Sequence, residues 1–293
     1  MARDNRSVGV VGAGTMGSGI AIVTARAGFK TILLDTDQKV LDRSFHLIDR
    51  FFSKSVEKGK MRPEQKEEIM NEYLVTSLNY EDLAECEFVV EAVFEDLELK
   101  KEVFRKVDKI CPPDTILGTN TSTLSITSIA AGSGRPDRVI GMHFCLPAQV
   151  MKLVEVTRGL LTSDETYKRT MQFGKELKQV FVTTKEVPGF ILNHFIVAFN
   201  NACIRAYEEG LASVEDIDKA VKLGLGYPMG PFELLDYIGL DTQLRVSMAL
   251  FEQVNDSRYW PPPLVRRMVD AGLLGRKTGR GFYQYKRPSM FGA

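Results

Sequence analysis

The sequence predicts an α/β fold class, namely a doubly wound sheet that carries a helical hairpin insertion and is followed by an all-α C-terminal domain. Three observations lead to this prediction. A short apolar run, Ser7–Val11, breaks into a glycine-rich turn and continues as a helix-compatible segment to Ala27. Apolar runs then alternate with segments of helical periodicity up to about residue 184, which is typical of parallel strands covered by helices. Beyond Pro188 the apolar residues follow helical spacing only.

The glycine-rich turn has the spacing of a dinucleotide-binding segment. Its first glycine allows a tight turn, its second lets the backbone approach a pyrophosphate, and its third lets the helix pack close to the strand. The phosphates would then lie on the unpaired N–H groups at the start of the helix. The expected cofactor-binding residues of this segment are Gly12, Ala13, Gly14, Thr15, Met16 and Gly17.

An acidic residue follows the expected second strand, Lys30–Leu34. Asp35 comes 23 residues after Gly12, close to where an acid binds the ribose hydroxyls of adenosine. A carboxylate there would repel a 2′-phosphate, so the pattern favours NAD over NADP as the cofactor. The strand, the turn and the helix together predict a Rossmann-type domain. A glycine-rich turn without any ligand is the alternative.

The sequence pattern predicts a helical hairpin over residues 38–73, inserted into this domain. Apolar residues at spacings of three or four predict one long helix over about 40–60, and Pro63 opens a second helix over 64–73. Two consecutive helices exceed what a parallel crossover needs. Lys54 and Lys58 share a face of the first helix and could bind phosphate groups together with Lys60. On charge pattern alone, an ordinary solvated surface is favoured for these lysines.

The remaining elements complete two domains. Strands are expected at 74–76, 86–93, 115–119, 138–143, 151–156 and 180–184, with helices at 97–110, about 126–131 and 164–177. The boundary is placed at residue 186, so that an NAD-binding domain spans 1–186 and a helical domain spans 187–293. Four helices are expected there, at about 190–209, 214–223, 230–253 and 263–271. Their apolar character predicts a homodimer through this C-terminal domain.

Composition narrows the classes of partner. The formal net charge is zero, so no basic field suggests a nucleic acid or a membrane surface. No apolar run approaches the ~20 residues of a membrane span, and the first residues are not those of a signal peptide. The scattered cysteines have no paired spacing, which indicates reduced thiols and a cytoplasmic protein, without a disulfide framework or a metal site. They are Cys86, Cys111, Cys145 and Cys203.

A dehydrogenase that oxidises an alcohol needs a general base near the hydroxyl group, and a histidine is the usual choice. The chain has three histidines. His46 lies on the long helix and His194 lies early in an apolar helix, where packed or solvated roles are expected. His143 ends a strand at the edge where ligands of doubly wound sheets gather. Glu155 lies on the next strand, where a buried acid would need a partner, and is expected to orient the imidazole of His143.

Several motifs together resemble the L-3-hydroxyacyl-CoA dehydrogenase family, and most closely its stand-alone bacterial 3-hydroxybutyryl-CoA dehydrogenases. The resemblance covers nearly the whole chain, and the motifs are specific in combination. Besides the glycine-rich turn they are Asn120–Ile126 (NTSTLSI), His143–Val156 (HFxxPxxVMKLVEV), Pro188–Asn193 (PGFILN) and Gly275–Tyr283 (GRKTGRGFY).

The resemblance implies an NAD-dependent interconversion of (S)-3-hydroxyacyl-CoA and 3-ketoacyl-CoA. By this resemblance His143 removes the proton of the 3-hydroxyl group while hydride passes to NAD, and Glu155 holds His143. Ser122 and Asn193 would hydrogen-bond the reacting oxygen or orient the substrate.

The resemblance also assigns residues that bind the two ligands. Glu95, Lys100, Ser122 and Lys277 would contact the cofactor. Lys54 and Lys58 match lysines that bind the phosphates of coenzyme A, which reverses the interpretation from charge pattern alone.

Two departures from the family pattern are visible. Leu146 stands where the family has an asparagine near the nicotinamide, and Thr123 stands where a second serine is common. The loss of a polar contact at Leu146 would weaken cofactor placement or reshape the acyl pocket. Cys145 beside it is expected to be a small packing residue, with an oxidisable thiol of low pKa as the alternative.

Two other functions are alternatives to the hypothesis of an acyl-CoA substrate. One is an NAD-dependent dehydrogenase of a free hydroxy acid or sugar acid, as in the gulonate dehydrogenases, which have a related fold. The lysines of the hairpin discriminate against it. The other is a catalytically idle structural or NAD-sensing protein, against which the set Ser122, His143, Glu155 and Asn193 argues.

Overall fold

The computed structural model describes residues 6–286 and divides the chain into two compact units. The first unit is Met1–Val187 and the second is Pro188–Ala293. The division falls one residue beyond the boundary placed from the sequence.

The first unit is built on one sheet of eight strands in the order β3-β2-β1-β4-β5-β6-β7-β8. The first six strands run parallel, β7 pairs antiparallel with β6, and β8 pairs parallel with β7. The order 3-2-1-4-5-6 is that of dinucleotide-binding sheets. The strands are β1 (Ser7–Val11), β2 (Lys30–Leu34), β3 (Leu74–Ser77), β4 (Cys86–Glu91), β5 (Ile116–Thr119), β6 (Val139–Phe144), β7 (Leu153–Arg158) and β8 (Val180–Thr184).

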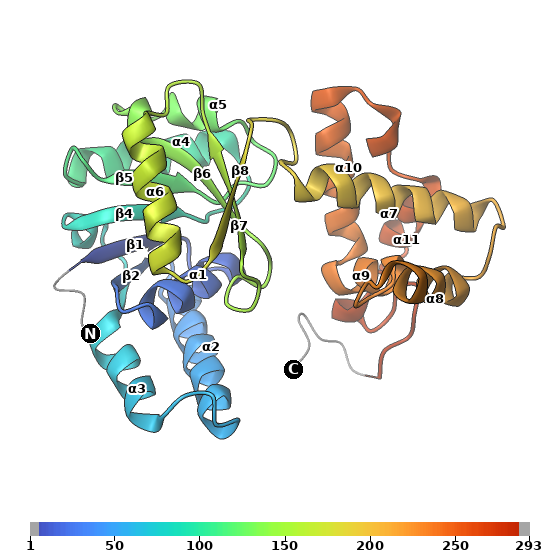
Figure 1. Ribbon diagram of the computed structural model, residues 1–293, viewed down its shortest axis with the longest axis horizontal. Coiled ribbons are helices and arrows are strands. Elements are labelled where there is room, and N and C mark those ends of the chain that lie inside the picture. The colour runs from blue at the N-terminus through green and yellow to red at the C-terminus, as the bar shows by residue number, and fades with distance from the viewer. Residues whose placement is uncertain (1–5, 287–293) are drawn as a thin grey trace. The chain divides into compact units, whose positions relative to one another are not determined.

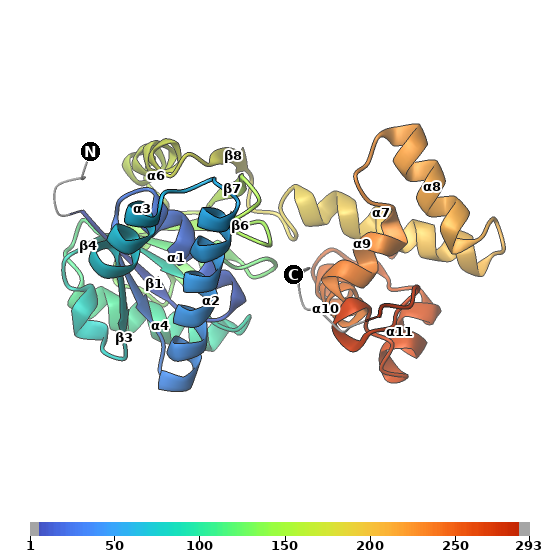
Figure 2. The same ribbon diagram turned by 90° about the horizontal axis from the view of Figure 1, so that it is seen from below.

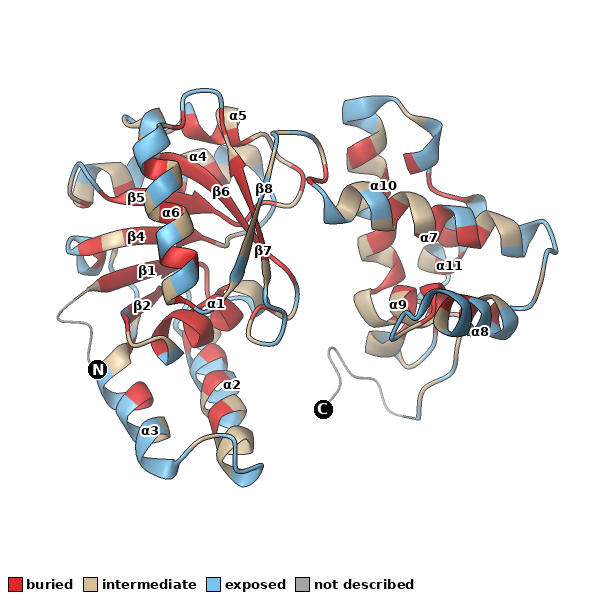
Figure 3. Cartoon of the chain, in the orientation of Figure 1, coloured by how far each residue is buried: buried red, intermediate tan, exposed pale blue. Residues whose placement is uncertain are grey.

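Helices cover both faces of this sheet (Figure 1). On one face lie α1 (Thr15–Arg26) and α6 (Asp164–Glu176), and on the other lie α4 (Leu97–Ile110) and α5 (Ile126–Ala130). The strands of the sheet are mostly buried (Figure 3). The carboxyl ends of the parallel strands meet at one edge, so the segments after β1, β2, β4, β5 and β6 are brought together there, as the sequence predicts.

The hairpin consists of α2 (Gln38–Glu57) and α3 (Pro63–Glu68), which extend past the sheet (Figure 1) and lie in front of it in the view from below (Figure 2). The second helix was expected to continue to residue 73, but Ile69–Tyr73 forms a π-helical turn. This wider turn places Ile69 and Met70 in the core of the first unit, whereas α3 itself buries no residue. The expectation of one regular helix over 64–73 was therefore wrong in its second half.

Strand β7 begins two residues later than expected from the apolar run at 151–156. The N–H groups of Val150 and Met151 both donate to the carbonyl of Pro147, so these residues close a turn and do not enter the sheet. The shift does not change which residues pair across β6 and β7.

The second unit is all-helical, as expected. Its helices are α7 (Leu192–Glu208), α8 (Val214–Leu225), α9 (Pro231–Ile238), α10 (Leu240–Val254) and α11 (Pro263–Asp270). The single helix expected at 230–253 was wrong, because the chain breaks at Gly239 between α9 and α10. Gly239 has φ +97°, a conformation that glycine adopts without strain. The apolar core of the unit contains Ile204, Phe232, Leu235, Leu240 and Val265.

Short 3₁₀ turns connect the larger elements, at Tyr80–Leu83, Pro136–Arg138, Ser257–Tyr259 and Arg276–Thr278. Within residues 6–286, no helix combines the length and the apolar character that a membrane span requires.

Candidate active site

The glycine-rich turn leaves room for an anionic group at the start of α1. Gly12 has φ +101°, and a Cβ on Gly17 would lie 1.7 Å from the carbonyl oxygen of Gly12, so both positions require glycine. A Cβ on Gly14 would meet no atom within 4 Å, which shows open space over the turn. No side chain caps the first turn of α1. Its N–H groups and the open space fit the pyrophosphate of NAD.

Asp35 lies beside this turn, at the carboxyl end of β2. Its Oδ2 accepts a hydrogen bond from the N–H of Ala13 at 2.8 Å, and its Oδ1 accepts one from Asp37 at 3.2 Å. The carboxylate is thus fixed next to the glycine-rich segment. This is the place expected for a residue that binds the ribose of adenosine.

His143 and Glu155 face each other across the antiparallel pair β6 and β7, where they are register partners. The Nδ1 atom of His143 lies 2.7 Å from Oε2 of Glu155, whose side chain is fully buried. A carboxylate accepts hydrogen bonds, so Nδ1 carries a proton, and in the neutral imidazole Nε2 has the lone pair. This arrangement makes Nε2 the atom that can accept a proton from a ligand.

Ser122 contacts that same nitrogen. Its Oγ lies 3.1 Å from Nε2 of His143, and with Nδ1 protonated the hydroxyl is the donor. Ser122 belongs to the turn after β5, and Asn120 at the start of this turn accepts a hydrogen bond from the N–H of Phe144 at 2.8 Å. The structure therefore brings Ser122, His143 and Glu155 into one contiguous set, as expected from the sequence.

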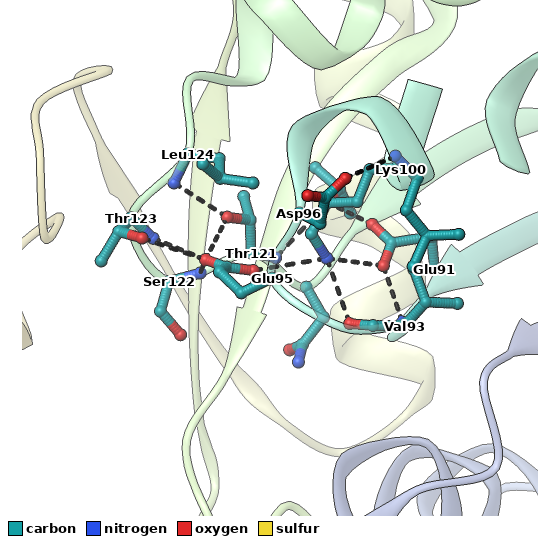
Figure 4. A network of polar contacts seen from close by, with 12 residues as sticks. Glu91, Val93, Glu95, Asp96, Lys100, Thr121, Ser122, Thr123 and Leu124 are labelled. Carbon is teal, nitrogen blue, oxygen red and sulfur yellow. Dashed lines mark hydrogen bonds and ion pairs between the residues drawn. The ribbon is translucent and has the colours of Figure 1, made fainter. Parts of the chain in front are cut away.

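Glu95 holds the turn that contains Ser122 (Figure 4). Its carboxylate accepts hydrogen bonds from the hydroxyl of Thr121 at 2.6 Å and from the N–H groups of Ser122 at 2.8 Å and Thr123 at 3.0 Å. Thr123, the residue that departs from the family pattern, keeps a hydroxyl that also donates to Glu95, at 3.2 Å.

Lys100 lies behind Glu95 and has only 1% of its side chain exposed. Its ammonium donates to Glu91 at 2.6 Å and lies 3.4 Å from the second carboxylate oxygen of Glu95. Sequence reasoning missed Glu91. A charged residue at the end of an otherwise apolar strand is a signal that could have found it, because a buried carboxylate needs a partner. The cofactor contact expected for Lys100 remains a prediction, and its burial favours an indirect role.

The two residues after β6 differ in exposure. Cys145 is buried, and burial raises the pKa of its thiol to about 11, with the nearby charge of Glu155 adding to the shift. This supports a packing role over a reactive thiol. Leu146 is 37% exposed at the ligand edge of the sheet, so its apolar side chain is available to a bound molecule.

The lysines expected to bind coenzyme A lie near the C-terminal end of α2. Lys58 is exposed and Lys54 is partly exposed. Within the described residues neither forms an ion pair, whereas Lys66 pairs with Asp49 on the same hairpin at 2.7 Å. Two uncompensated ammonium groups four residues apart are available for an anion.

Two expected site residues belong to the second unit. Asn193 lies in the first turn of α7, and Lys277 lies in the 3₁₀ turn Arg276–Thr278, where its ammonium donates to Asp241. Their roles toward substrate and cofactor remain predictions.

The other two histidines have no comparable setting. His46 is exposed on α2. His194 contacts the hydroxyl of the buried Tyr259 through Nδ1 at 2.9 Å, which is a packing role. Among residues 6–286 no cluster of histidine, cysteine and acidic side chains could hold a metal ion.

Comparison with known proteins identifies the family to which the chain belongs. The model of the NAD binding domain of 3-hydroxyacyl-CoA dehydrogenase matches residues 7–187, and the model of the C-terminal domain of the same enzymes matches residues 189–285. The chain belongs to the 3-hydroxyacyl-CoA dehydrogenase family. It is therefore an NAD-dependent oxidoreductase that interconverts 3-hydroxyacyl-CoA and 3-ketoacyl-CoA.

Relatives of this dehydrogenase match over nearly their full length. The 3-hydroxybutyryl-CoA dehydrogenase of Clostridioides difficile is 44% identical over 95% of this chain and 99% of its own. The human mitochondrial hydroxyacyl-coenzyme A dehydrogenase is 42% identical over 96% of this chain and 91% of its own. The crystal structure of the (S)-3-hydroxybutyryl-CoA dehydrogenase of Ralstonia eutropha superposes with a TM-score of 0.91 at 40% identity, covering 97% of this chain and 100% of that one.

Proposed function

We propose that this dehydrogenase acts on short acyl chains, such as (S)-3-hydroxybutyryl-CoA, with the pair His143 and Glu155 as its general base. The contact of 2.7 Å between the imidazole and the buried carboxylate carries the proposal. Relatives with 40–44% identity that are named 3-hydroxybutyryl-CoA dehydrogenases support the short chain.

The side chains would divide the work as follows. NAD, when bound at the glycine-rich turn and Asp35, supplies the hydride acceptor. His143 accepts the proton of the 3-hydroxyl group at Nε2, and Glu155 stabilises the imidazolium that forms. Ser122 donates a hydrogen bond to the reacting oxygen and helps to place it next to Nε2. Asn193 would hydrogen-bond the reacting oxygen or orient the substrate, as the family resemblance implies.

Lys54 and Lys58 would bind the phosphates of coenzyme A. Their exposure and the lack of ion-pair partners among the described residues support this role, because a phosphate would supply the missing counter-charge. The same lysines separate an acyl-CoA substrate from a free hydroxy acid or sugar acid, which carries no such phosphate.

The decisive assay follows NADH absorbance with acetoacetyl-CoA, longer 3-ketoacyl-CoAs and free acetoacetate as substrates. We expect the highest kcat/KM for acetoacetyl-CoA and no measurable turnover of free acetoacetate. The double variant Lys54→Glu/Lys58→Glu should raise KM for acetoacetyl-CoA at least about ten-fold with kcat retained. An unchanged KM, or preference for the free acid, would contradict the proposed substrate. The variant Lys39→Glu, at the other end of α2, is the matched control.

The same proposal includes a cytoplasmic homodimer formed through the second unit. Strongly exposed apolar side chains on that unit support the dimer, namely Phe195, Leu211, Leu223 and Leu225. Four free, buried cysteines support a reducing compartment. Sedimentation of the wild type and of Leu223→Glu tests the dimer, since a monomeric wild type would refute it.

A further inference from the structure

The carboxylate of Glu95 accepts several hydrogen bonds from the turn that contains Ser122. One oxygen, Oε1, accepts from the hydroxyl of Thr121 and from two successive backbone N–H groups, those of Ser122 and Thr123 (Figure 4). Successive N–H groups that converge on one anion form a nest, whose backbone conformation depends on that anion. The conformation of this turn therefore depends on where the Glu95 carboxylate lies.

Two buried groups determine that position. Lys100 lies 3.4 Å from Oε2 of Glu95, on the side opposite the turn. Its ammonium is in turn held by Glu91, which also accepts hydrogen bonds from the N–H of Val93 at 2.8 Å and the hydroxyl of Thr119 at 2.7 Å. Both Glu91 and Lys100 have 1% of their side chains exposed, so neither can relax into solvent.

The ionisation of Glu95 is consistent with this arrangement. Burial on its own raises the pKa of the Glu95 carboxyl group, but the charge of Lys100 and the hydrogen bonds from the turn outweigh it and lower the pKa below its usual value. Glu95 is thus charged at neutral pH, which gives its hydrogen bonds to the turn their charge-assisted strength.

Ser122 connects the carboxylate of Glu95 to the imidazole of His143. The N–H of Ser122 is bonded to Glu95, and the hydroxyl of the same residue lies 3.1 Å from Nε2 of His143. We propose that Glu95, held by Lys100 and Glu91, is a positioning residue that aligns the hydroxyl of Ser122 with Nε2 of His143. The proposal rests on the base assigned to His143 above, and it assigns Glu95 a role other than the direct cofactor contact that the family resemblance implies.

The variant Glu95→Gln separates the two roles. The amide oxygen can still accept from the turn, but the amide NH₂ then faces the ammonium of Lys100, donor against donor. If the amide turns over, the NH₂ faces the donors of the turn. Either orientation displaces Ser122, and an ångström of misplacement costs on the order of 100-fold in rate. We expect kcat to fall about 10- to 100-fold while Kd for NADH, from fluorescence titration, stays within about two-fold. A raised Kd with an unchanged kcat would overturn the proposal in favour of direct cofactor contact.

A double-mutant cycle with Ser122→Ala tests the path through Ser122. If Glu95 acts through that hydroxyl, Glu95→Gln should change kcat less than about two-fold in the Ser122→Ala background. Multiplicative losses would overturn the proposal. Glu98→Gln is the matched control, because Glu98 is an exposed residue of α4, the helix that carries Lys100, and its carboxylate pairs with Lys101 at 2.8 Å. It should keep wild-type kinetics.

A readout without turnover keeps the inference separate from the proposed function. The chain has three histidines, so the ¹⁵N resonances of the His143 imidazole can be assigned by the loss of one set in His143→Gln. Glu95→Gln should move the Nε2 resonance of His143 toward its position in Ser122→Ala, and an unmoved resonance would overturn the positioning role. An inactive wild type would instead refute the proposed substrate while this measurement still decides the role of Glu95.

A second variant covers a loss of folding in Glu95→Gln. Thr121→Val has nearly the same shape and removes the hydroxyl that donates to Glu95 at 2.6 Å. The same hydroxyl oxygen accepts from the N–H of Leu124 at 2.9 Å, so the turn loses two hydrogen bonds. We expect a fall in kcat of about 3- to 10-fold with an unchanged Kd for NADH, because the N–H groups of Ser122 and Thr123 still donate to Glu95 and hold part of the turn. Wild-type kcat in this variant would overturn the proposal.

Discussion

Replacing Glu155 by glutamine tests the central pair of the site. The two side chains are nearly identical in shape, so the change removes one charge from a fully buried position. In the proposed mechanism this charge stabilises the imidazolium that forms when His143 takes the proton of the substrate. In the variant the amide oxygen can accept the Nδ1 proton only as a neutral partner. If the amide presents its NH₂ instead, Nδ1 must accept, and the proton moves to Nε2, where it blocks the base.

The expected loss follows from the contact distance. The nitrogen and oxygen lie 2.7 Å apart, so the centres of charge are about 4 Å apart, and at an effective dielectric constant of about 20 their attraction is about 4 kcal/mol. A neutral hydrogen bond would retain about 1 kcal/mol of this. The remaining ~3 kcal/mol corresponds to a fall in kcat of about 100- to 1,000-fold. Because the proposed contacts of NAD are at the glycine-rich turn and Asp35 and do not include Glu155, Kd for NADH should stay unchanged.

The assay is the increase of NADH absorbance with saturating NAD and (S)-3-hydroxybutyryl-CoA, which is the direction in which His143 takes the proton, together with circular dichroism to verify folding. Glu165→Gln is the control, because Glu165 is an exposed acid that pairs with Arg138 on the surface of the same unit. A folded Glu155→Gln variant with kcat within about three-fold of wild type would refute the assignment of the pair as the general base.

Three further outcomes are expected. Gly14→Ala should keep the wild-type Tm, because a Cβ there meets no atom within 4 Å. It should raise Kd for NADH at least about ten-fold, because the Cβ fills the space for the pyrophosphate. An unchanged Kd would exclude pyrophosphate binding at this turn. Cys145 should resist iodoacetamide at pH 8, where a pKa of about 11 leaves on the order of one thiol in 1,000 ionised, and rapid labelling of the native protein in a peptide map would contradict its packing role. Leu146→Asn should change Kd for NADH or the preference among acyl chains and leave the reaction type unchanged. A variant that oxidises another class of substrate would contradict this prediction.

The sheet was predictable because each element has a local signal. Apolar runs alternate with helical periodicity, and the glycine spacing identifies the first turn from three residues. The break at Gly239 was not predictable, because a single glycine inside a helical pattern is tolerated and only its positive φ ends the helix. The π-helical turn at Ile69–Tyr73 likewise depends on how two side chains reach the core.

The site was predictable where chemistry and strand position coincide. His143 and Glu155 combine a titratable pair with neighbouring strands, so their contact follows from pattern. Lys100 lies on the buried face of α4 with Val103, Phe104 and Val107, whereas Lys106 is exposed, so helical spacing places this lysine on the apolar face but does not identify its partner Glu91. The role of Glu95 depends on hydrogen bonds to residues 26 to 28 positions away, which only the folded chain brings together.

The facing positions of His143 and Glu155 on β6 and β7 have a consequence for how this enzyme can change over evolution. Side chains alternate between the two sides of a sheet, so sliding β7 by a single position would point the acid away from the imidazole and leave an uncompensated charge among apolar neighbours. The main-chain hydrogen bonds between the two strands therefore keep Glu155 opposite His143. The connection between them, which carries the buried Cys145 and Ala148, can change only in ways that return the strands to the same alignment.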